Sequence, residues 1–137
     1  MSQYMLLVYE PEVEPEEQAE REQVTPVLVE LHAGLRDAGL LVGVQRLRST
    51  ESATSVRVRG GETEITDGPF AVTKEVLAGY YVLECADLDA ALAHAARLPM
   101  TPWATIEVRP VMPPGEWLET ARRAGVDLAD EDARDLA

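Results

Sequence analysis

The sequence is poor in cysteine and in basic and aromatic residues, and it has no long apolar run. Cys85 is the only cysteine among 137 residues, which excludes an intramolecular disulfide and a zinc cluster built from cysteines. No stretch approaches the roughly 20 apolar residues of a membrane-spanning helix. The N-terminus also lacks the basic and apolar segments of a signal peptide. We therefore expect a cytoplasmic protein that does not engage a membrane.

The shortage of basic residues leaves a strong negative charge. The chain has 12 Lys and Arg residues against 25 Asp and Glu residues, a net charge of −13. Residues 10–22 hold seven acids and one arginine, and residues 112–137 hold seven acids and three arginines. The negative charge is thus concentrated in these two segments. Such a chain repels phosphate backbones and anionic lipid surfaces, so we expect no nucleic-acid binding.

Aromatic residues make up only 5% of the chain, although 46% of it is hydrophobic. The core must therefore be built mainly from Leu, Val and Ala. The length suits a single domain, which we assign to residues 1–111. Residues 112–137 form an acidic C-terminal extension, with Pro113 and Pro114 at its start and a short helix expected over residues 116–124.

Hydrophobic patterns predict four strands and two helices. The strands are expected at residues 4–9, 40–47, 80–85 and 104–111. Pro26 indicates either a kink in the first helix or a helix start near Thr25, and Gly39 is the expected C-terminal cap. The second should follow Asp87, a capping residue, and bury a stripe of apolar residues. The members of this stripe are Leu88, Ala91, Leu92, Ala95 and Leu98. The order predicts an α+β domain of split βαβ units, with both helices on one sheet face.

A β-hairpin closed by Gly60 and Gly61 is predicted between the two units. A two-residue turn fixes which positions of the two strands face each other. The expected pairs are Arg59 with Glu62, Val58 with Thr63, Arg57 with Glu64 and Val56 with Ile65. Opposite charges then meet on one face and mostly apolar pairs on the other, which favours this register.

The motif Asp67-Gly68-Pro69-Phe70 follows the hairpin, inside the segment VRVRGGETEITDGPFAVTKEVLAGYYVLE. Further recognisable segments are YMLLVYE, LRDAGLLVG, DLDAALAHAARLP and IEVRPV. Over about residues 4–111 the chain resembles the DGPF-motif branch of the YCII-related family. The resemblance implies a ferredoxin-like fold whose open sheet faces meet in a dimeric α+β barrel. A two-helix layer leaves one sheet face uncovered, which also predicts a homodimer.

The resemblance also bears on activity. One group of the wider family resembles dehydrochlorinases that act on chlorinated aromatics through a His–Asp pair. In this chain His32 lies about one turn from the position of that helix histidine. Members of the DGPF branch are often encoded beside extracytoplasmic-function sigma factors and have no agreed activity.

Asp67 and His32 are the candidate catalytic residues. Asp67 is a candidate base or hydrogen-bond acceptor for a small ligand; alternatively it accepts backbone N–H bonds and shapes the turn before Pro69. His32 lies one helical step from Leu28 and Leu35, so it belongs to the apolar face. It is either a general base or a core histidine satisfied by one hydrogen bond. The two histidines of the chain are isolated, so the sequence predicts no metal site.

Four further residues are candidates for ligand binding: Phe70, Lys74, Tyr80 and Arg109. Alternatively, Phe70 plugs the chain against the sheet and Lys74 forms a solvated ion pair with Glu75. Alternation places Tyr80 and Arg109 on the face turned away from the helices, where Arg109 would need an acidic partner or anchor a ligand. No glycine-rich loop precedes a helix, so we expect no nucleotide cofactor.

Two functions from different classes fit these residues. The first is a cofactor-independent lyase or isomerase acting on a small organic molecule in a dimer cavity. The second is a non-catalytic protein that binds a small molecule or assists a sigma factor. The first predicts a carboxylate and an imidazole within hydrogen-bond reach of a common point, and the second predicts no such convergence.

Overall fold

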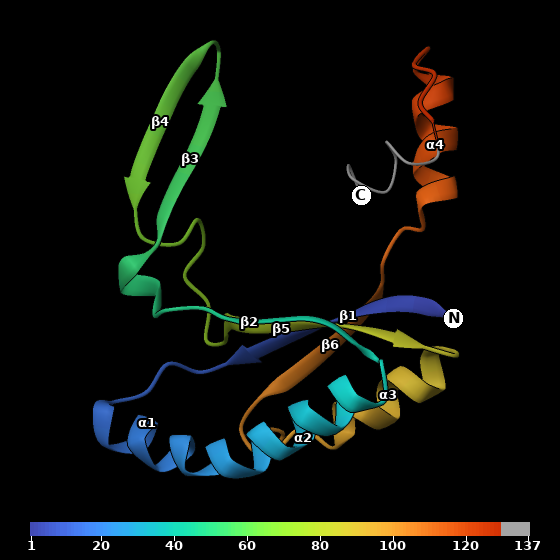
Figure 1. The fold of residues 1–137 in the computed structure, drawn as a ribbon. Coiled ribbons are helices and arrows are strands. Elements are labelled where there is room, and N and C mark those ends of the chain that lie inside the picture. The colour runs from blue at the N-terminus through green and yellow to red at the C-terminus, as the bar shows by residue number, and fades with distance from the viewer. Residues whose placement is uncertain (130–137) are drawn as a thin grey trace.

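The structure, a computed structural model, describes residues 1–129. Four antiparallel strands form the main sheet in the order β2-β5-β1-β6. They are β1 (Ser2–Glu10), β2 (Leu41–Arg46), β5 (Val76–Cys85) and β6 (Thr105–Pro110). Helices α2 (Thr25–Asp37) and α3 (Leu88–Ala96) cover one face of this sheet (Figure 1). This arrangement confirms the predicted ferredoxin-like α+β fold.

The core lies between the sheet and these helices. On β5, Tyr81, Leu83 and Cys85 are buried against the helices, and the alternating residues are less buried. Leu6 and Leu83 are each only 1% exposed and are the largest fully buried side chains. The predicted stripe of the second helix is only partly right. Ala91, Ala95 and Leu98 are buried, but Leu88 and Leu92 are each 47% exposed. The face of α3 that packs on the sheet is the one with the small alanine side chains.

Two short helical segments precede α2 and were not predicted. They are α1 (Pro15–Arg21) and the 3-10 turn η1 (Glu22–Val24), and neither contains a buried residue. Of the two alternatives for Pro26, the helix start is confirmed: α2 begins at Thr25 with Pro26 in its first turn. Gly39 adopts a φ of +73° beyond the C-terminus of α2, as a left-handed cap requires. The Asp87 carboxylate accepts the Ala90 N–H at 2.9 Å and caps α3 as predicted.

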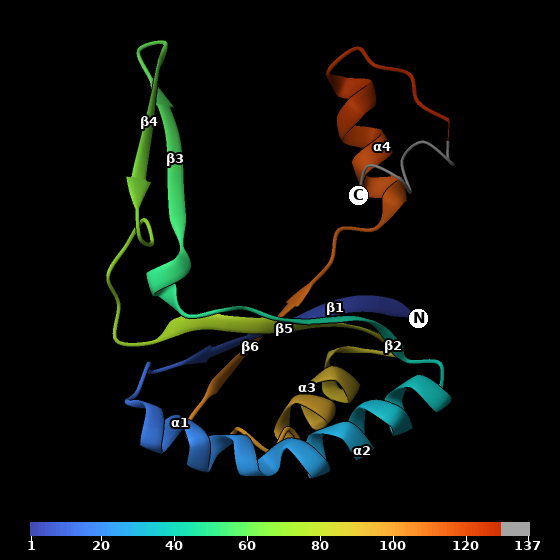
Figure 2. The same ribbon diagram turned by 60° about the vertical axis from the view of Figure 1, so that its left-hand side comes forward.

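The hairpin is confirmed in every predicted pair. It consists of β3 (Thr54–Arg59) and β4 (Glu62–Asp67), with Gly60 and Gly61 both at positive φ. It projects from the sheet on the side opposite the helices (Figures 1 and 2). Val56 and Ile65, which share its apolar face, are therefore 69% and 70% exposed in the protomer.

The motif at residues 67–70 forms the joint between the hairpin and β5, but not as the sequence suggested. No backbone N–H within residues 1–129 donates to the Asp67 carboxylate, so it does not hold the turn. Instead Gly68 N–H donates to the Ala53 carbonyl at 2.7 Å, and the Ser55 hydroxyl donates to the Gly68 carbonyl at 2.8 Å. Gly68 has a φ of +95°, a conformation that favours glycine. Phe70 is 87% exposed and does not plug the chain against the sheet.

Helix α4 (Pro114–Arg123) confirms the short helix expected after the last strand. It rises from the same side of the sheet as the hairpin, at the other end (Figures 1 and 2). Leu118 and Ala121 are buried, but outside the main core. Residues 130–137 of the predicted acidic extension lie outside the described residues. No helix within residues 1–129 is both long and apolar enough to cross a membrane.

Candidate functional site

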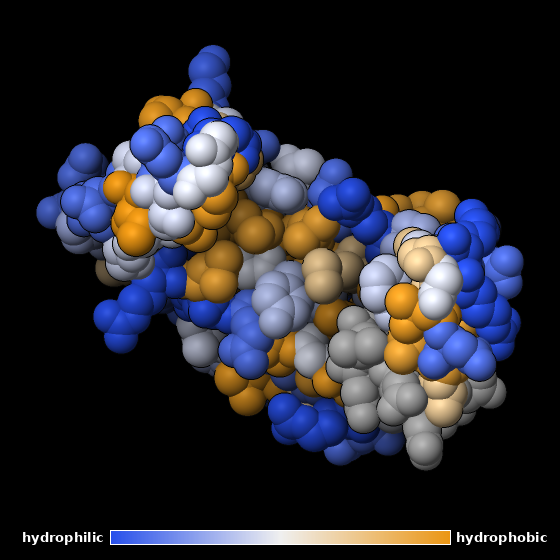
Figure 3. Space-filling model, turned by 90° about the horizontal axis from the view of Figure 1, so that it is seen from above, coloured by the Kyte–Doolittle hydropathy of each residue, from blue (hydrophilic) through white to orange (hydrophobic). Residues whose placement is uncertain are grey.

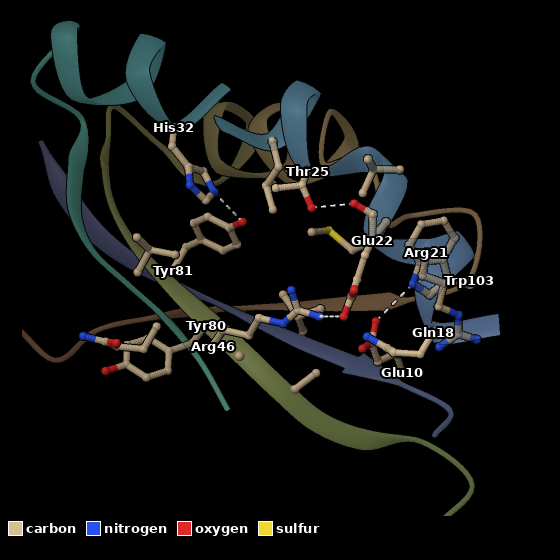
Figure 4. A pocket seen from close by; sticks show the side chains of 18 residues that line it. Glu10, Gln18, Arg21, Glu22, Thr25, His32, Arg46, Tyr80, Tyr81 and Trp103 are labelled. Atoms are coloured by element: carbon tan, nitrogen blue, oxygen red, sulfur yellow. Dashed lines mark hydrogen bonds and ion pairs between the residues drawn. The ribbon is translucent and has the colours of Figure 1, made fainter. Parts of the chain in front are cut away.

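A cavity of about 170 Å³ lies between the sheet and the helical layer (Figure 4). Strands β1, β2 and β5 form one wall, together with Met100 and Trp103 from the loop before β6. The segment from α1 through η1 to α2 forms the other wall. Most of the lining is apolar, including Val8, Leu28 and Val44. The cavity is therefore suited to a small, largely apolar molecule.

A histidine–tyrosine pair is the chemically notable feature of this cavity. His32 Nε2 and the Tyr81 hydroxyl oxygen are 2.7 Å apart, and the two rings meet edge to face with centroids 5.2 Å apart. The inward face of α2 supplies His32, which lies three residues before the buried Leu35. Alternation along β5 supplies Tyr81, which is only 4% exposed. The pair thus joins the helical layer directly to the sheet.

Burial sets the protonation state of both groups. Burial lowers the pKa of His32 below its ordinary value, and the nearby Arg36 charge lowers it further. Burial also raises the pKa of Tyr81 to about 12, although the Arg46 charge opposes this shift. At neutral pH the imidazole is therefore neutral and the phenol protonated. One hydrogen-bonded site then offers a ring nitrogen able to accept a proton and a hydroxyl able to donate one.

Trp103 anchors the charged residues at one side of the cavity. Its indole N–H donates to the Glu10 carboxylate at 3.0 Å, and the Arg21 guanidinium lies over its ring at 5.5 Å. Arg21 also donates to the Pro11 carbonyl at 2.8 Å and lies 3.7 Å from the Glu17 carboxylate. These contacts hold α1, which buries no residue of its own, against β1.

A second charged pair lies where the cavity meets a wider groove. Arg46 of β2 and Glu22 of η1 are 3.9 Å apart, with side chains 65% and 53% exposed. Both residues also line the adjoining groove, of about 940 Å³, which runs past the loop after β1. The Arg46–Glu22 pair therefore lies where the cavity and the groove meet.

The predicted site residues are divided between the two sides of the sheet. His32 lines the cavity on the helical side. Asp67, Phe70 and Lys74 are exposed on or beside the hairpin, which stands on the opposite side. The structure therefore does not bring Asp67 and His32 together within one protomer.

Tyr80 is among the residues that line the cavity, although both Tyr80 and Arg109 occupy strand positions that alternate away from the buried face. Arg109 is exposed and forms no ion pair within residues 1–129. The expected ion pair between Lys74 and Glu75 is also absent there; the Glu75 carboxylate instead lies within hydrogen-bond reach of the Thr105 hydroxyl, at 3.4 Å. Residues 1–129 contain no cluster of three His, Cys, Asp or Glu side chains able to hold a metal ion.

Tyr81 and Arg46 are two of the cavity residues that were not candidates from the sequence. The sequence did contain a signal for Tyr81. Adjacent residues of a strand point to opposite faces of the sheet, so one of the two neighbouring tyrosines must face the helices. Arg46 had no comparable signal, since it comes at the end of a strand and its role depends on where η1 packs.

Comparison with known proteins gives the family. The sequence model of the YCII-related domain matches residues 2–117, which extends from β1 into α4. A protein of Rhizobium meliloti (strain 1021), described as uncharacterized protein R00369, is 46% identical over 86 residues, covering 58% of this chain and 68% of its own length. That name assigns no activity. The chain belongs to the YCII-related family.

Proposed function

We propose that this protein acts on a small organic molecule in the cavity between helices and sheet, without a cofactor, with His32 and Tyr81 as its proton-transfer pair. The observation that carries the proposal is the 2.7 Å contact between His32 Nε2 and the Tyr81 hydroxyl at the cavity wall. We also place the chain in the DGPF-motif branch, on residues 67–70 and the segments around them.

The size of the cavity limits the ligand. A dry apolar cavity of about 150 Å³ is enough to hold a benzene molecule. The cavity here, at about 170 Å³, has room for one small ring or a short branched chain. Hydrogen-bonding groups of such a ligand would meet His32 and Tyr81, while its apolar part would contact Val44 and Leu28.

The pair suits isomerisation or elimination. Neutral His32 can accept a proton from an activated carbon or hydroxyl of the ligand, and the electron pair left behind shifts to form a double bond. In an isomerisation the proton returns to another atom; in an elimination a leaving group departs with the electrons. The Tyr81 hydroxyl can donate a hydrogen bond, or its proton, to the oxygen on which negative charge develops.

A non-catalytic binding function is the second candidate, including an accessory role beside a sigma factor. One observation favours it. Within residues 1–129, no carboxylate or carbonyl accepts a hydrogen bond from the other ring nitrogen of His32, so nothing orients the imidazole as in a catalytic triad. Asp67, the acidic residue of the family motif, lies on the other side of the sheet. The same cavity would then hold a ligand without transforming it.

Proton exchange in D2O separates these two functions. Acetylacetone is a small neutral probe with an activated CH2 group, and NMR follows loss of its CH2 signal. The enzyme proposal predicts faster exchange in the presence of the protein, and His32→Gln should reduce this acceleration at least about a hundredfold, the lower end of the range for general-base catalysis. His94→Gln, on α3, is the matched control and should retain the acceleration. Binding of the probe without accelerated exchange would favour the binding function over the enzyme.

We further propose that a second copy of the chain covers the open sheet face. Apolar side chains gather between the hairpin and α4 on this face (Figure 3), and Val58 on the hairpin is 57% exposed. Light scattering at micromolar concentration should give twice the 15.0 kDa chain mass. Ile65→Asp, on the apolar face of the hairpin, should shift the mass toward the monomer, because a charge would be buried. Thr66→Asp adds the same charge on the other face of the hairpin and should leave the mass unchanged. A monomeric mass for the unmodified protein would contradict the proposal.

A further inference from the structure

Resting on the function proposed above, we infer that the ligand is a small aryl or branched-alkyl carboxylate and that Arg46 binds its carboxylate group. The apolar body would fill the cavity, and the carboxylate would lie where the cavity meets the groove. Arg46 is then a specificity-determining residue, because it selects an anion over a neutral or cationic molecule of the same shape.

The position of Arg46 is the first support. It lines both the cavity and the groove, so a group bound to it lies where the two spaces meet. Four charged side chains line the cavity: Glu10, Arg21, Glu22 and Arg46. Glu10 is held by Trp103, and Arg21 is held by the Pro11 carbonyl and stacked on Trp103. Only the remaining two are free to change partners.

The unused hydrogen-bonding capacity of Arg46 is the second support. A guanidinium has five N–H donors in a planar fork that matches a carboxylate. Within residues 1–129, no hydrogen bond uses any of these donors of Arg46. Its one partner, Glu22, is 3.9 Å away, and both side chains are more than half exposed. Such a pair contributes little to stability, so a ligand carboxylate can displace Glu22 and gain direct hydrogen bonds.

The backbone supporting each residue decides between an anionic and a cationic ligand. Arg46 belongs to β2 and pairs with Gly79 of the central strand β5, which gives it a fixed position. Glu22 belongs to η1, where no residue is buried. A binding group is more precise on a packed strand than on a peripheral turn. Arg46 is therefore the better anchor, and Glu22 the partner that gives way.

The charge of Arg46 also reaches the reactive pair. Its guanidinium opposes the rise in the pKa of Tyr81, so the charge is close enough to act on the phenol. In Figure 4 Arg46 lies between the His32–Tyr81 pair and Glu22. A carboxylate bound there would bring the carbon atoms next to it toward His32. Negative charge that develops on those atoms would also be stabilised by Arg46.

Three probes of one shape and different charge test this inference: benzoate, benzamide and benzylamine. Ligand-observed NMR titration measures their dissociation constants for the full chain. We expect benzoate to bind at least about tenfold more tightly than benzamide, as a charge-assisted bidentate contact implies. Arg46→Gln should abolish this difference, and Arg46→Lys should keep part of it. Glu22→Gln should tighten benzoate binding severalfold, because the competing carboxylate is removed.

Arg48→Gln is the matched control. Arg48 lines the groove but not the cavity, so the same loss of charge two residues away should leave benzoate binding unchanged. Circular dichroism would show that each variant is folded. If Arg46→Gln does not fold, the Arg46→Lys variant still provides a test. Equal affinities of this variant for benzoate and for benzamide would contradict the inference.

The other outcomes have distinct meanings. Tighter binding of benzylamine, lost in Glu22→Gln, would overturn the inference and make Glu22 the anchor. Equal binding of benzoate and benzamide, unaffected by Arg46→Gln, would also overturn it, yet would leave the cavity as a ligand site. Binding of none of the three probes would contradict both the inference and the proposed function.

Discussion

Replacing Gly79 with alanine is expected to destabilise the protein by about 3 kcal/mol, at the upper end for overpacking in a core. Gly79 is buried in the middle of β5, opposite Val8 on one side and Arg46 on the other. A Cβ atom added there would lie 2.6 Å from the Gln45 carbonyl oxygen and 3.3 Å from the Arg46 Cα atom. Both are backbone atoms, so no side-chain rotation relieves the contact and β2 must move.

Urea unfolding measures this effect, and Gly43→Ala is its control. Gly43 lies in the neighbouring strand β2, but a Cβ atom added there meets nothing within 4 Å. We expect Gly43→Ala to change the free energy of unfolding by less than about 1 kcal/mol, since only intrinsic strand preference is altered. An equally small change for Gly79→Ala would show that β2 adjusts freely.

Displacement of β2 would also affect the proposed ligand site. Val44, Gln45 and Arg46 of β2 all line the cavity, next to the point of contact with Gly79. A shift that makes room for a Cβ atom would therefore widen the cavity and move Arg46 away from Tyr81. Gly79 thus supports the site by allowing two strands to approach closely, not by contact with a ligand.

Patterns of burial made the main fold predictable from the sequence. Strand alternation and the spacing of Leu28, Leu31 and Leu35 report directly on which side of an element faces a core. The hairpin was predictable because two glycines and paired charges specify a register locally. Segment α1 was missed for the opposite reason: it buries no residue, and its acidic sequence lacks an apolar stripe. Its position depends on Arg21 and Trp103, which are 82 residues apart in the chain.

The site was less predictable than the fold. His32 was identified from the helix stripe, yet its partner depends on how α2 lies across β5, which a stripe does not specify. The alternative in which the Asp67 carboxylate holds the turn is wrong, because Ser55 and Ala53 at the base of the hairpin hold the joint through Gly68. The direction in which the hairpin leaves the sheet also separates Asp67 from His32, and no local pattern encodes that direction.

The burial of Tyr81 predicts a specific loss of stability at alkaline pH. An unfolded tyrosine loses its proton near pH 10, whereas the pKa of Tyr81 is raised to about 12 in the folded state. Between these values the unfolded chain releases the proton first, so rising pH favours unfolding. The contribution of Tyr81 is fully present below pH 10 and is lost as pH rises through about 12. A difference of this size corresponds to about 2 to 3 kcal/mol.

The measurement compares the unmodified protein with Tyr81→Phe by urea unfolding from pH 8 to pH 11.5. The variant lacks the hydrogen bond to His32, which lowers its stability by about 1 kcal/mol at every pH below 10. Above pH 10 only the unmodified protein loses the Tyr81 contribution. Its curve should therefore approach that of the variant and fall below it before pH 11.5, because the expected loss exceeds the initial difference of about 1 kcal/mol. The buried Cys85, whose pKa is also raised by burial, titrates in both proteins and cancels in the difference. Curves that remain parallel up to pH 11.5 would mean that the Tyr81 phenol beside His32 is not shielded from water.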